Sequence, residues 1–166
     1  MRDGGRLSAA IGVLDDMRDR HKPAHLALKA WGDSARYAGA KDRAFVSGLV
    51  LDALRRRRSL AWRIGGEGAR AEVLGVLALD WGWPIDRIAE ACGDEPHGPG
   101  ALGEAEQVAL TTPRPLADAP EDIRGDYPEW TEPLFARAFG ERRAEELAAM
   151  AQRAPVDLRI NALKTD

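Results

Sequence analysis

One short stretch of this chain alternates like a β-strand, whereas elsewhere apolar residues recur at helical spacing. Apolar Val156, Leu158 and Ile160 are separated by polar residues, which is the pattern of a half-buried strand. No stretch before Pro155 alternates in this way. Because a lone strand leaves its backbone hydrogen-bonding groups unpaired, we expect residues 156–166 to be the truncated first strand of a further α/β domain.

The rest of the chain favours helices. Ala, Leu and Arg are abundant and aromatic residues make up only 6% of the 166 residues, a composition typical of helices rather than sheets. Apolar residues form one amphipathic stripe from Phe45 to Leu54, and they surround residues 73–79 on almost every side. We therefore predict an all-α body with residues 73–79 in its central helix.

Glycine, proline and charge divide the chain into four parts. Residues 1–110 form a helical bundle that ends in a short helix, and residues 111–126, with three prolines, form a linker. Residues 127–155 form a helical hairpin, in which we expect Trp130 to face inward, and residues 156–166 begin the truncated domain.

Several function classes are disfavoured by composition. No stretch is apolar enough for a membrane span and the N-terminus has no secretory signal, so we expect a soluble cytoplasmic protein. His21 and His25 stand four apart, but Pro23 between them would break a helix, so we predict no metal site. Cys92 has no second cysteine to pair with, and we interpret it as a small core residue.

Charge is distributed unevenly along the chain. Residues 1–70 contain 15 Lys or Arg against 8 Asp or Glu, whereas residues 71–166 contain 9 against 19. This polarity suggests that one face meets a polyanion, although a bundle with uneven surface charge would show the same counts.

Four short motifs follow one another near the C-terminal end. They are residues 127–130 (YPEW), 139–140 (FG), 153–155 (RAP) and 158–164 (LRINALK). This series resembles the segment that leads into the catalytic part of the bacterial 16S ribosomal RNA (cytosine-5) methyltransferase B family, also called the RsmB or Sun family. Upstream, residues 42–55 resemble the third helix of the NusB-like RNA-binding domain in that family.

The resemblance implies a NusB-like bundle that recognises ribosomal RNA, with a Rossmann-type catalytic domain, missing from this chain, as its partner. That domain would use S-adenosylmethionine as cofactor and would supply the catalytic cysteines. We predict no catalytic or cofactor-binding residue in this chain, because Cys92 lacks the Pro-Cys or Thr-Cys-Pro surroundings of those enzymes. The Gly65–Gly68 cluster follows no strand, so we interpret it as a helix-breaking turn.

The run Arg55–Arg58, called the arginine run below, is the strongest candidate for RNA contact. Guanidinium groups bind phosphate bidentately and stay charged. We expect Arg55 to pack inward or cap its helix and the next three arginines to face solvent. The candidate bundle residues for RNA contact are Lys41, Arg43, Arg56, Arg57, Arg58 and Arg63. A solvated helix end would explain the run equally well.

The terminal strand adds three candidates. The resemblance implies that Arg159, Asn161 and Lys164 lie near the RNA backbone in the intact protein. Two other functions also fit the sequence: a stand-alone NusB-like antitermination factor that binds RNA, and a structural protein-interaction domain. An antitermination factor of this kind would not need residues 127–164.

Overall fold

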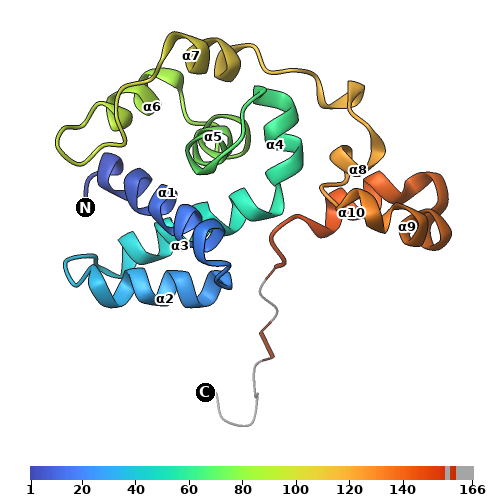
Figure 1. Cartoon of the computed structure of the whole chain (residues 1–166), viewed down its shortest axis with the longest axis horizontal. Helices are drawn as coiled ribbons and strands as arrows, with labels where there is room; N and C mark the ends of the chain where they lie inside the picture. The colour runs from blue at the N-terminus through green and yellow to red at the C-terminus, as the bar shows by residue number, and fades with distance from the viewer. Residues whose placement is uncertain (156–157, 160–166) are drawn as a thin grey trace.

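The structure, a computed structural model, describes residues 1–155, 158 and 159. All regular structure in these residues is helical, which confirms the predicted all-α body (Figure 1). Most of the predicted strand, with Asn161 and Lys164, lies outside the described residues. Leu158 and Arg159, which are described, are exposed and belong to no regular element.

Helices α1 to α7 form the bundle. Their bounds are α1 Asp3–Arg20, α2 Ala24–Ser34, α3 Ala40–Arg55, α4 Arg57–Ile64, α5 Ala69–Gly75, α6 Ile85–Cys92 and α7 Glu104–Thr111, and a π-helical turn η1 (Val76–Asp80) continues α5. Helix α5 lies in the centre of the bundle (Figure 1), where it packs against α1, α3 and α4.

The position of α5 follows from its sequence. Val73, Leu74, Val76 and Leu77 are at most 1% exposed, because helices cover α5 and η1 on several sides. They pack with Leu49 of α3 in one hydrophobic cluster. The predicted central helix over residues 73–79 is therefore confirmed.

A second group of helices follows the bundle. It contains η2 Leu116–Asp118, α8 Glu121–Arg124, η3 Glu129–Thr131, α9 Glu132–Phe139, η4 Gly140–Arg142 and α10 Arg143–Met150. Helix α10 packs on α8 and α9, and α8 also contacts α4. The region predicted as a linker thus contains helical turns and packs against the bundle.

Asp126 joins this second group to the bundle. Its Oδ1 accepts the backbone N–H groups of Arg58 and Ser59, at 3.0 and 2.8 Å, in the first turn of α4. Burial raises the pKa of Asp126, although these hydrogen bonds and one from the Ser59 hydroxyl oppose the rise. A residue of the predicted linker therefore caps a bundle helix.

The inward-facing side of the hairpin differs from the prediction. Trp130 is 76% exposed and Leu134 is 60% exposed, so the prediction that Trp130 faces inward was wrong. Tyr127 is buried instead and packs edge-on against Phe135, with their ring centroids 5.1 Å apart. The short 3-10 turn η3, which contains Trp130, precedes α9 and shifts the face that the apolar residues present.

Candidate functional site

The four arginines of the run lie on two helices. Helix α3 ends at Arg55 and α4 begins at Arg57, with Arg56 at φ −120° between them. This break directs the side chains to different neighbours. Arg55 donates to Asp52 at 3.0 Å, and Arg56 forms an ion pair with Asp80. The Arg56 side chain is only 19% exposed, so the prediction that it faces solvent was wrong.

The remaining two arginines of the run also contact carboxylates. Arg57 Nε lies 3.0 Å from Glu72 Oε1, and Arg58 forms an ion pair with Asp122. Their side chains are 55% and 37% exposed. A phosphate would therefore compete with a protein carboxylate at every arginine of the run.

Glu72, like Asp52, is almost fully buried. It lies in α5, and its side chain is 4% exposed beside Arg18 and Arg57. Burial raises the pKa of Glu72, although the two arginines oppose the rise. One carboxylate oxygen, Oε2, is buried without a hydrogen-bond partner. Arg57, together with Arg18, thus offsets the free-energy cost of burying the ionised carboxylate of Glu72.

The other predicted contacts divide into exposed and structural residues. Lys41 and Arg159 are exposed. Arg43 is half-buried and donates to the backbone carbonyls of Ala38 at 3.0 Å and Ala35 at 3.3 Å, so it holds the α2–α3 loop. Arg63 is half-buried too, and its Nε has no hydrogen-bond partner.

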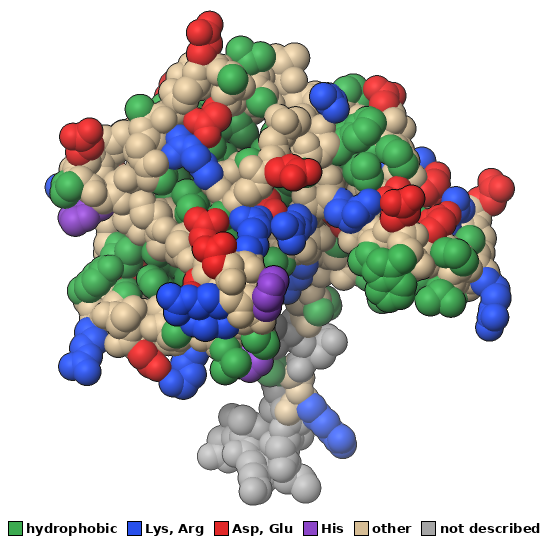
Figure 2. Space-filling model, in the orientation of Figure 1, with side chains coloured by type: hydrophobic (Ala, Val, Ile, Leu, Met, Phe, Trp, Pro, Cys, Tyr) green, Lys and Arg blue, Asp and Glu red, His purple; other side chains and the backbone are tan. Residues whose placement is uncertain are grey.

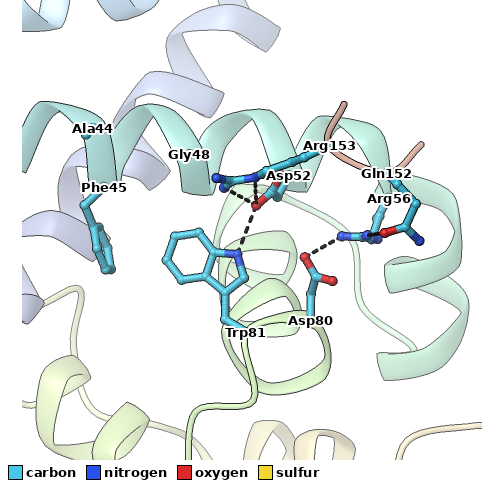
Figure 3. A pocket seen from close by; sticks show the side chains of 9 residues that line it. All are labelled: Ala44, Phe45, Gly48, Asp52, Arg56, Asp80, Trp81, Gln152 and Arg153. Atoms are coloured by element: carbon cyan, nitrogen blue, oxygen red, sulfur yellow. Dashed lines mark hydrogen bonds and ion pairs between the residues drawn. The ribbon is translucent and has the colours of Figure 1, made fainter. Parts of the chain in front are cut away.

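A pocket of about 490 Å³ lies between α3, η1 and the segment after α10 (Figure 3). Asp52 lies at its centre with a side chain that is 3% exposed. Trp81 Nε1 donates to Asp52 at 3.0 Å, and Arg153 Nε lies 3.0 and 3.1 Å from its two oxygens. Burial opposes ionisation of Asp52, but the hydrogen bonds from Arg153 and Trp81 outweigh it and hold the pKa of this carboxyl below its usual value.

The wall of this pocket is shaped to receive Arg153. A Cβ atom on Gly48 would lie 2.8 Å from Arg153 Nη2, so a larger residue at this position would require the guanidinium group to shift. Arg56 links Asp80 to Gln152, whose side-chain oxygen accepts at 3.3 Å (Figure 3). Residues 152 and 153 are therefore bound by side chains of the bundle.

Sequence reasoning missed this pocket. The signal was Asp52, an acid within the apolar stripe of residues 45–54. An ionised carboxylate on a core-facing stripe needs a buried hydrogen-bonding partner. That partner, Arg153, lies 101 residues away in sequence, so only the tertiary structure identifies it.

The glycine cluster Gly65–Gly68 lies in a turn between two helices. Gly65 and Gly68 have φ of 63° and 106° and connect α4 to α5, which agrees with the predicted helix-breaking turn. No strand precedes this turn in the described part of the chain, so it lacks the strand–loop–helix form of a nucleotide cradle. Among the same residues, no three His, Cys, Asp or Glu side chains gather as a metal site would require.

Cys92 has the environment of a core residue. It is 1% exposed at the end of α6. Burial raises the pKa of its thiol, although Arg70 opposes the rise, so the reactive thiolate form is disfavoured. The interpretation of Cys92 as a core residue is confirmed.

Comparison with protein-family models, curated proteins and solved structures finds no match for this chain. Within the described residues, none of the helices combines the length and apolarity that crossing a bilayer requires. An assignment of function therefore depends on the motifs, the charges and the pockets of the chain itself.

Proposed function

We propose that this chain is the NusB-like RNA-recognition region of an S-adenosylmethionine-dependent 16S ribosomal RNA (cytosine-5) methyltransferase. Its role would be to position ribosomal RNA for a catalytic domain that is not part of this chain. The motif series of residues 127–164 and the basic composition of residues 1–70 support the proposal. The helical body is compatible with a NusB-like bundle.

The Asp52–Arg153 contact is the observation that carries the proposal furthest. Arg153 is the first residue of the RAP motif, which in the family leads toward the catalytic part. Because Asp52 and Trp81 hold Arg153 against the bundle, whatever follows Pro155 would leave the bundle from a defined point. A recognition module needs such a fixed point if it is to present RNA to a neighbouring domain.

We assign the phosphate contacts mainly to cations that no carboxylate neutralises. Arg36 and Lys41 are exposed, and neither forms an ion pair with any described residue. Figure 2 shows Lys and Arg side chains over the C-terminal end of α2 and the loop that follows. The arginine run contributes less, because its charges are already paired.

The test is binding of 16S ribosomal RNA fragments at several salt concentrations. We expect the affinity to fall as salt rises from about 50 to about 200 mM, because Lys and Arg release counterions from the RNA. The double variant Arg36→Gln/Lys41→Gln should reduce the slope of log affinity against log salt by about two.

A matched control removes the same charge elsewhere. Arg137 and Arg142 are exposed on the hairpin, and Arg137→Gln/Arg142→Gln should leave the slope unchanged. Wild-type protein that does not bind 16S fragments, or that binds them with no salt dependence, would disprove the proposed function.

A further inference from the structure

A second pocket, of about 740 Å³, has three aromatic side chains in its lining. It lies between the N-terminal part of α1, α2, the α2–α3 loop and the α6–α7 loop. Its lining includes Trp31, Tyr37, Pro96 and His97. Tyr37 is 75% exposed, although it is a large aromatic residue in a short loop. Aromatic rings in the lining of a solvent-accessible pocket suit a flat ligand.

Hydrogen bonds hold both loops that form this pocket. The Ser8 hydroxyl of α1 donates to the His97 carbonyl at 2.6 Å and fixes the α6–α7 loop. On the other side, Arg43 donates to the carbonyls of Ala35 and Ala38, which flank Tyr37. The backbone that carries Tyr37 and His97 is therefore held in place before a ligand arrives, which lowers the entropy lost on binding.

The same region carries positive charge. Arg36 directly precedes Tyr37, and Lys41 follows four residues later; both are exposed. Arg2 also lines the pocket, with a side chain that is 83% exposed beside Asp94. In Figure 2, hydrophobic surface lies at the left edge, near the α2–α3 loop, with blue side chains below it. Aromatic rings beside exposed cations are the combination that binds single-stranded nucleic acid.

We infer that this pocket is a stacking site for an unpaired base of single-stranded RNA. The base would stack on Tyr37 within the ring-lined pocket, and the adjacent phosphates would meet Arg2, Arg36 and Lys41. The inference rests on the proposed function, because it names the part of the RNA that this bundle binds. Stacking tolerates any base, so the site would recognise an unpaired strand rather than a sequence.

The experiment uses the full chain and a fluorescein-labelled oligoadenylate about ten nucleotides long, followed by fluorescence anisotropy. Tyr37→Ala should weaken binding about five- to tenfold, because a stacking ring is lost. Tyr37→Phe keeps the ring and should bind within about twofold of wild type. Since Tyr37 is largely exposed, the thermal unfolding midpoint should stay the same in both variants.

Trp130→Ala is the matched control. It removes an aromatic side chain of equal exposure from the hairpin, away from the pocket, and should leave oligoadenylate binding unchanged. Equal weakening by Tyr37→Ala and Trp130→Ala would overturn the inference, because it would indicate nonspecific loss of aromatic surface.

Three further results would overturn the inference, and they differ in what they say of the proposed function. If wild-type protein binds RNA and Tyr37→Ala binds equally well, the stacking site is wrong and the proposed function stands. The same holds if adenosine monophosphate binds as tightly as the oligonucleotide, because the pocket would then serve a free nucleotide. If wild-type protein binds neither oligoadenylate nor 16S fragments, both proposals fail.

Discussion

Replacement of Asp52 by alanine should destabilise the chain much more than replacement of its partner Arg153. Asp52 is almost fully buried, and its removal leaves the indole N–H of Trp81 without an acceptor and two guanidinium groups without a counter-charge. Loss of one member of a buried ion pair costs about 3–5 kcal/mol. Because the side chains of Arg55 and Arg153 are 35% and 58% exposed, water can solvate them, and we expect about 2–3 kcal/mol for Asp52→Ala.

Arg153→Ala should cost only about 1 kcal/mol, because Asp52 keeps its hydrogen bonds from Trp81 and Arg55. Urea unfolding followed by tryptophan fluorescence measures both free energies. Asp33→Ala is the control: its ion pair with Lys29 is exposed on both sides, so the loss should stay below about 0.5 kcal/mol. Equal losses for Asp52→Ala and Arg153→Ala would refute the reasoning, because the carboxylate would then stabilise the fold only through its contact with Arg153.

Three other changes test the packing and the charges. Gly4→Ala should lower the unfolding free energy by about 1–3 kcal/mol, because a Cβ there would lie 2.6 Å from a carbonyl oxygen of α6. Gly12→Ala in the same helix is the control: its Cβ would meet nothing within 4 Å, so it should raise the unfolding free energy by about 0.5–1 kcal/mol. The denaturant midpoints of the two variants measure both effects. Asp126→Ala should cost about 1–2 kcal/mol by uncapping α4, and amide exchange in the first turn of α4 should quicken. Arg6 and the N-terminal amine hold the pKa of Asp42 at about 2, and the pKa of Asp52 is lowered as well. Both carboxylates therefore stabilise the fold above the unfolded pKa of about 4 and lose that contribution as pH falls toward 2. The urea midpoint should therefore drop over this range, and less steeply in Asp42→Asn.

Those parts of the fold that depend on local periodicity could be predicted from the sequence. The stripe from Phe45 to Leu54 and the apolar run of residues 73–79 became α3 and the central helix, because burial of one continuous apolar face decides both. The short helix before residue 110 formed as α7. Trp130 could not be placed in this way, because the 3-10 turn η3 changes the phase of the helical face just before α9.

The candidate site was harder to predict, because its contacts join residues far apart in the chain. Arg43 resembles a surface cation in sequence, and only the tertiary fold brings it to the carbonyls of Ala35 and Ala38. Tyr37 could not be predicted as part of a site, because a single aromatic residue in a loop carries no periodic signal. Its pocket exists only where α1, α2, the α2–α3 loop and the α6–α7 loop meet.

The charge asymmetry of the sequence is largely cancelled in space at the arginine run. Glu72, Asp80 and Asp122 belong to the acidic part of the chain, and each pairs with one arginine of the run. The basic part therefore folds against the acidic part at the junction of α3 and α4. At the α2–α3 loop and the start of α3, no acid among the described residues pairs with Arg36 or Lys41, so their positive charge stays exposed. Because a cation already paired with a carboxylate is a weaker partner for phosphate, the proposed RNA contact falls at the α2–α3 loop rather than at the arginine run.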